Sequence, residues 1–206
     1  MALNEFDLLV IVIILIGIVY GVFRGAGRQI AGLFSAWLGL IVCLWLYIPF
    51  SRKILQGIFG KMGGGGSNVV FDTFSFFMLL IIFSALVQFI ILQTTKSPEE
   101  KTDASDKTFV DRANQRNTMG ALNVVGGLVT GLIVTVVWLS IFMAPIQHAV
   151  SSAGSGGTFV VQLRAAMNTS FLIPLLRQVL GMIYWSIQFF IPSSGELPVI
   201  FRSFLG

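Results

Sequence analysis

The chain has 206 residues, of which 55% are hydrophobic and 11% are charged, and its formal net charge is +4 at pH 7. Soluble domains carry about a quarter of charged residues, so water is not expected to be the only solvent of this protein. The basic residues are scattered and no nucleic-acid-binding motif accompanies them, so contact with anionic lipid headgroups is the simpler explanation of the charge. The sequence therefore predicts a membrane protein that contacts the lipid bilayer and binds no nucleic acid.

Four long apolar runs dominate residues 1–150, the predicted transmembrane domain. The runs cover residues 6–23, 30–50, 69–92 and 119–146. At about 1.5 Å rise per residue, each can cross or nearly cross a hydrocarbon core of roughly 30 Å. Backbone at that depth must be helical or form a closed barrel, and these runs lack the alternation of barrel strands. The predicted fold is an all-α bundle of four transmembrane helices.

The charges around the first run indicate whether it is a cleavable signal peptide and how it is oriented in the membrane. Glu5 and Asp7 stand at its start, whereas Arg24 and Arg28 follow it. A cleavable signal peptide has the opposite order, with basic residues before the apolar stretch. We therefore interpret the run as a retained first helix. The two arginines after it favour an N-terminus outside the cell by the positive-inside rule.

Glycines mark a side-chain-free face on three of the predicted helices. They are Gly17, Gly21, Gly25, Gly32, Gly127 and Gly131. Such faces let two helix backbones approach closely, which favours association in a membrane where lipid supplies little hydrophobic force between helices. We interpret these glycines as helix-packing sites, within the bundle or in self-association. A glycine-lined permeation path is the alternative interpretation.

Charged residues at the ends of the runs are candidates for an ion-binding or interface site: Asp7, Asp72 and Arg24. Asp7 and Asp72 begin the first and third runs, which places them on the same membrane face if the chain crosses four times. Their ordinary role is to interact with the positive end of a helix dipole, and a shared cation or proton entry site is the alternative. Gln88 and Asn123 could join helices by hydrogen bonds or line a cavity.

No segment presents the residue pattern of a catalytic or metal site. The single cysteine, Cys43, lies inside the second run, so an intramolecular disulfide and a cluster of thiolates are excluded. His148 has no acidic or thiol neighbour in its own segment, as a metal site or a triad would require. The sequence therefore predicts no enzyme, no metal site and no cofactor.

Two segments outside the runs are harder to interpret. Residues 94–118 are strongly hydrophilic with charges that cancel, and we interpret them as a charged loop. Residues 151–206 form a predicted membrane-associated region. Within it, residues 170–192 are apolar and aromatic but carry a polar stripe with Arg177, whose placement at the bilayer centre would cost about 2.5 to 3.5 kcal/mol. We therefore expect an amphipathic interfacial helix there, with a fifth membrane helix as the alternative.

The order of these features resembles the colicin V production protein family. The resemblance rests on Asp7, Gly17, Gly21, Arg24 and Gly25, then on the charged third loop and the pattern GLVTG at Gly127 to Gly131. It runs over most of residues 4–146. It implies a multi-pass protein of the bacterial inner membrane that is linked to colicin V production or export and to envelope homeostasis. It implies no biochemical activity and no catalytic residues.

Two functions of different classes fit the sequence. The first is an accessory protein that supports toxin production or export through contacts with other membrane proteins or with itself. The second is a small oligomeric channel or transporter whose path would be lined by Asp7, Asp72, Gln88 and Asn123. An intramembrane enzyme comes last, because none of the predicted helices presents a nucleophile with a base or a set of metal ligands.

Overall fold

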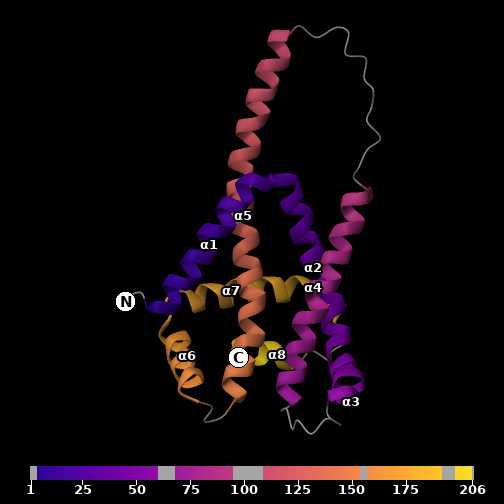
Figure 1. Cartoon of the computed structure of the whole chain (residues 1–206), viewed down its shortest axis with the longest axis vertical. Coiled ribbons are helices and arrows are strands. Elements are labelled where there is room, and N and C mark those ends of the chain that lie inside the picture. The colour runs from indigo at the N-terminus through magenta and orange to yellow at the C-terminus, as the bar shows by residue number, and fades with distance from the viewer. Residues whose placement is uncertain (1–3, 60–67, 95–108, 154–156, 192–197, 206) are drawn as a thin grey trace.

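The computed structural model describes residues 4–59, 68–94, 109–153, 157–191 and 198–205, and in this part of the chain every regular element is a helix (Figure 1). The elements are α1 (Glu5–Arg24), α2 (Ala26–Phe50), a π-helical turn (Ser51–Leu55), α3 (Gln56–Phe59), α4 (Asn68–Thr94), α5 (Phe109–Ser152), α6 (Thr158–Thr169), α7 (Leu172–Ile187), a 3₁₀ turn (Gln188–Phe190) and α8 (Val199–Leu205).

Four stretches of these helices are long and apolar enough to cross a membrane: Glu5–Arg24, Ala26–Ile58, Asn68–Ile91 and Val124–Ser152. The predicted fold class, an all-α membrane protein with four transmembrane helices, is confirmed. α5 already begins at Phe109, so the last part of the segment predicted as a charged loop is helical. Residues 95–108 of that segment lie outside the described residues.

A tight turn joins α1 and α2 into a helical hairpin, and the ends of α1 follow from local chemistry. Asn4 caps α1, since its side chain accepts a hydrogen bond from the Asp7 amide at 2.8 Å while the Asp7 carboxylate accepts one from the Asn4 amide at 3.2 Å. The helix ends at Gly25, whose φ of 77° lies in the region that glycine adopts readily. α2 starts at the next residue, and the two helices diverge from this turn in Figure 1, so that α1 packs mainly on α5 and α2 mainly on α4.

The lower end of α2 in Figure 1 is irregular because of a proline. Pro49 has no N–H to bond the carbonyl four residues before it. The helix then widens into the π-helical turn at Ser51–Leu55, where each N–H reaches five residues back. A single turn of regular helix, α3, completes this end of the bundle.

α5 is the central element of the bundle and packs against α1, α2, α4, α7 and α8. Its 44 residues extend for roughly 66 Å, about twice a hydrocarbon core of roughly 30 Å. Figure 1 shows its N-terminal part rising beyond the α1–α2 turn. The aromatic core lies toward the other end, where Phe76 of α4 meets Phe201 of α8 with ring centroids 6.1 Å apart.

The C-terminal region contains a bent helix pair, in which α6 and α7 meet at 78°. α7 lies across the bundle in Figure 1 and buries Ile173, Leu176, Leu180 and Ile187 against it. Arg177 is exposed and lies over the ring of Phe204, 5.7 Å from its centroid. The helix is therefore amphipathic, as predicted, with its arginine outside the protein core.

Candidate functional site

Four of the six predicted packing glycines lie between α1 and α5. A Cβ on Gly21 would lie 2.5 Å from the carbonyl oxygen of Gly127 and 2.7 Å from Cα of Gly131, distances that no side chain tolerates. Gly17 faces the side chain of Thr135 in the same way. These glycines thus allow backbone contact between two helices of one chain.

The other two predicted packing glycines lie elsewhere. Gly25 forms the turn between α1 and α2. Gly32 faces α4, where a Cβ would meet the side-chain nitrogen of Gln88 at 3.8 Å, which is an ordinary van der Waals distance. A side chain is therefore excluded by backbone contact at the α1–α5 crossing and not at Gly32.

Asp7 is buried at the point where α1 meets the bend between α6 and α7. Its carboxylate accepts hydrogen bonds from the hydroxyl of Ser170 and from the backbone amides of Phe171 and Leu172, both at 3.1 Å. It therefore caps the start of α7 as well as the start of α1, and its charge faces the positive end of the α7 dipole. The groups that satisfy this carboxylate all belong to the protein itself.

Asp72 has a different surrounding, near the start of α4. One of its carboxylate oxygens is buried without a hydrogen-bond partner, and its charge acts on Tyr47 of α2 and on His148 of α5. Asp7 and Asp72 thus have separate neighbours and are not brought together as one site. The proximity of His148 to an acidic group was missed from the sequence, because the carboxylate belongs to another helix.

A small polar cavity of about 70 Å³ lies among α1, α2, α4 and α5. Its lining combines predicted packing glycines with Arg24 and Gln88. Its lining consists of Gly17, Tyr20, Arg24, Gln29, Gly32, Gln88, Gly131, Val134, Thr135 and Trp138. Arg24 lies over the ring of Tyr20, 5.7 Å from its centroid. The side chain of Asn123, the other polar residue considered with Gln88, lies outside the described residues.

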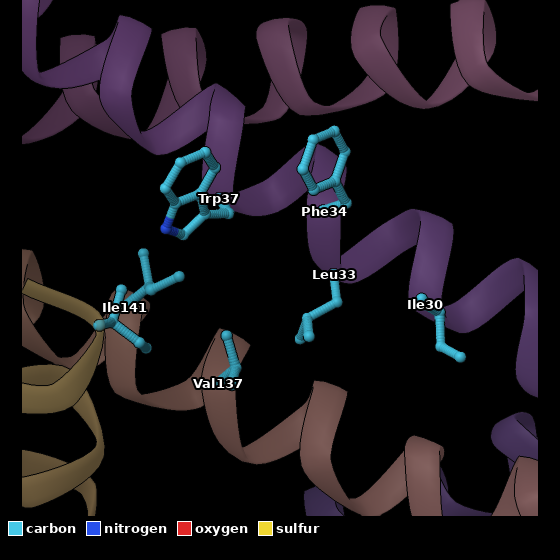
Figure 2. Close-up of a pocket in the computed structure, with 7 residues that line it drawn as sticks. Ile30, Leu33, Phe34, Trp37, Val137 and Ile141 are labelled. Carbon is cyan, nitrogen blue, oxygen red and sulfur yellow. The ribbon is translucent and has the colours of Figure 1, made fainter. Parts of the chain in front are cut away.

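A larger hollow of about 380 Å³ is apolar and lies between α2, α5 and α7 (Figure 2). Its lining consists of Ile30, Leu33, Phe34, Trp37, Val137, Ile141 and Ile183, which we call the apolar groove. A second hollow of about 490 Å³ continues from it between α5 and α7, since Val137 and Ile183 line both. No charged side chain is among the residues of either lining, so this region suits an apolar occupant.

Comparison with known proteins gives one family. Residues 6–109, just over half of the chain, match the family described as colicin V production protein. The chain belongs to the colicin V production protein family. The match includes nearly all of α1, all of α2 and α4, and the residues Asp7, Gly17, Gly21, Arg24 and Gly25 on which the resemblance rested. No curated protein and no solved structure matched the chain.

Family membership and fold together make this a multi-pass membrane protein in contact with lipid. The family match ends at residue 109, where α5 begins. Gly127 and Gly131, the apolar groove side of α5 and the whole α6–α7 pair therefore lie outside the matched stretch. The packing contacts of α1 with α5 and the hydrogen bond between Ser170 and Asp7 are therefore both made with residues outside the matched stretch.

Proposed function

We propose that this protein is an accessory protein of the bacterial inner membrane that supports colicin V production or export and envelope homeostasis through contacts with other membrane proteins. Membership of the colicin V production family supports a role in colicin V production or export. The apolar groove supports the mode of action, because it is a hollow on the membrane-spanning part of the bundle that the protein's own helices leave unfilled. No catalytic activity is part of this proposal.

The glycine faces argue for the groove as the contact surface. Gly21 and Gly127 are already used between α1 and α5 within one chain, so they are not available for a partner helix. The groove instead offers a concave surface on α2 and α5, flanked by α7, into which side chains of a partner's transmembrane helix would pack. Close packing is the main source of association energy between helices in lipid.

Photo-crosslinking in living cells tests whether the groove contacts a partner protein. A photoreactive phenylalanine analogue would replace Phe34, which lines the groove and is 52% exposed, or Phe23, which is 84% exposed and does not line it. We expect a discrete protein adduct from position 34 and lipid adducts alone from position 23. Lipid adducts alone from both positions would contradict the proposed protein contact.

Filling the groove tests whether that contact serves toxin export. Val137→Trp would place a large side chain in the groove, and Val129→Trp would place the same side chain on α5 at a position that is 49% exposed and outside the groove. In cells that lack the natural protein, we expect colicin V release to be restored by the wild type and by Val129→Trp but not by Val137→Trp. Equal release with and without the protein would refute the accessory role.

A small oligomeric channel is the second candidate, and the surroundings of Asp72 favour it. A carboxylate oxygen buried without a hydrogen-bond partner, whose charge acts on Tyr47 and His148, is an arrangement suited to holding a cation in a membrane. Ion flux through proteoliposomes that is reduced by Asp72→Asn would support this candidate. Flux no greater than that of empty liposomes, with insertion verified, would leave the accessory role.

A further inference from the structure

The polar cavity among α1, α2, α4 and α5 has the charge and the donor set of an anion site. We propose that it binds one small monovalent inorganic anion, with chloride as the probe of that class. The inference is independent of the accessory role, since the cavity is separate from the apolar groove and shares no lining residue with it.

The charge of the lining is the first step of the argument. Arg24 is the one charged side chain among the ten lining residues, and none of the ten is an aspartate or glutamate. Its guanidinium lies over the ring of Tyr20, and a ring face accepts few of the five N–H groups that an arginine carries. This partly buried cation has no carboxylate among the lining residues to balance it, so it favours a counter-ion.

The uncharged polar groups supply the second step. Gln29 donates from its side-chain nitrogen to the Gly127 carbonyl at 3.1 Å, and Thr135 donates to the Gly131 carbonyl at 2.7 Å. The side-chain nitrogen of Gln88, by contrast, is buried without a partner. A buried N–H donor left unpaired is unfavourable, so Gln88 requires an acceptor. An anion next to Arg24 would serve both groups.

The size and valence follow from the same residues. Gly17, Gly32 and Gly131 are three of the lining residues and contribute no side chain to the cavity. The resulting volume of about 70 Å³ exceeds the about 10 to 15 Å³ needed by one water-sized particle. One arginine balances one negative charge, whereas a divalent anion such as sulfate would leave a net negative charge buried in the bundle.

Thermal unfolding of the purified full-length protein in lipid nanodiscs tests the site. Chloride would be titrated against gluconate at constant ionic strength, with sulfate in a parallel series. We expect a saturable rise of the unfolding temperature with chloride and none with sulfate, because a ligand that binds only the folded protein stabilises it. The absence of a saturable rise with chloride, or an equal rise with sulfate, would overturn the proposal.

Variants then assign the effect to the cavity. Arg24→Gln should abolish the chloride-dependent rise, and Gln88→Leu should weaken chloride binding by about tenfold, as expected for one hydrogen bond to a charged group. Arg28→Gln is the matched control, because Arg28 is exposed on the same hairpin and does not line the cavity. An unchanged response in both Arg24→Gln and Gln88→Leu would refute the site. If Arg24→Gln does not fold, Gln88→Leu decides alone.

A local readout comes from Trp138, which lines the cavity. In a variant with Trp37, Trp45 and Trp185 replaced by phenylalanine, iodide should quench the remaining fluorescence in a saturable manner that chloride reverses. Quenching that rises linearly with iodide and is insensitive to chloride would show only collisions from outside and would contradict the site.

Discussion

Gly21 and Gly127 each occupy the space where the other residue's side chain would be. A Cβ on Gly21 would lie 2.5 Å from the Gly127 carbonyl oxygen, and a Cβ on Gly127 would lie 2.6 Å from the Gly21 carbonyl oxygen. The contact is thus reciprocal and involves backbone on both sides. It holds the first helix of the chain directly against the central helix α5.

Gly21→Ala should destabilise the protein because the new methyl group meets backbone that cannot rotate away. We expect a loss of about 1 to 3 kcal/mol in the free energy of unfolding, the usual range for overpacking a tight contact. Unfolding by SDS in mixed micelles, followed by circular dichroism, measures this loss.

The matched control for this change is Gly27→Ala, on the same hairpin, where a Cβ would meet nothing within 4 Å. Since alanine is the better helix former by about 1 kcal/mol, this variant should be as stable as the wild type or more so. Equal losses from both substitutions would show that the Gly21 contact has no special weight.

Asp7→Ala should loosen the junction of α1 with α7. The substitution leaves the Ser170 hydroxyl and the amides of Phe171 and Leu172 without their acceptor. Hydrogen bonds to a charged group contribute about 1.5 to 3 kcal/mol each, less when they share one acceptor, so we expect a loss of about 3 kcal/mol. Limited proteolysis between α5 and α6 should become faster, and its rate is the measurement.

Two further variants separate the capping role of Asp7 from a general charge effect. Glu5→Gln removes an exposed carboxylate from the same turn and should leave the proteolysis rate unchanged. Ser170→Ala removes one of the three donors and should have an intermediate effect. A rate in Glu5→Gln as high as that in Asp7→Ala would argue against the junction.

The sequence was sufficient for the helices but not for their partners. An apolar run of 18 or more residues can only be a span in lipid, so the four membrane helices follow from hydropathy alone. A glycine face identifies the side of a helix that packs. The sequence around Gly21 does not identify Gly127 as the residue that it contacts. In the sequence, Asp7 and Asp72 are both acidic residues at the start of a helix. Their surroundings differ because α7 contacts Asp7, whereas α5 carries a neighbour of Asp72.

Trp37→Phe should weaken the contact between α7 and α2 while keeping an aromatic ring in place. The indole N–H of Trp37 donates to the Ser186 hydroxyl at 2.9 Å, a bond of about 1 kcal/mol that phenylalanine cannot form. We expect amides of α7 to exchange with deuterium about fivefold faster. Trp185→Phe, which changes a 68% exposed tryptophan of α7 itself, should leave the exchange unchanged. A uniform increase over all helices would instead indicate global destabilisation.

Cysteine labelling in intact cells tests the predicted orientation. In a Cys43→Ala background, cysteines would be introduced at Gly27 and Gly57, which are exposed and have no atoms near their missing side chains. The arginines beside the α1–α2 turn favour a cytoplasmic location for it. We therefore expect an impermeant maleimide to label position 57 from outside and position 27 only after permeabilisation. The reverse pattern would invert the topology.

The candidate sites show where local sequence information ends. Arg24 and Gln88 lie in different helices, and each looked like an ordinary interfacial or interhelical residue. Only the crossing of α1, α2, α4 and α5 places them on one cavity. The same holds for the apolar groove, whose lining residues are ordinary apolar positions of three separate helices in the sequence. They form one surface only because α7 lies across α2 and α5.

The bond between Asp7 and Ser170 joins residues 163 positions apart, and this sets an order on biosynthesis. A ribosome that has delivered the first four helices to the membrane has not yet released the residues that satisfy the Asp7 carboxylate. Until the final fifth of the chain emerges, the protein carries an unsatisfied acidic group at the beginning of its first span. A prematurely ended chain would keep that exposed charge permanently, which gives membrane proteases a simple chemical distinction between finished and unfinished molecules.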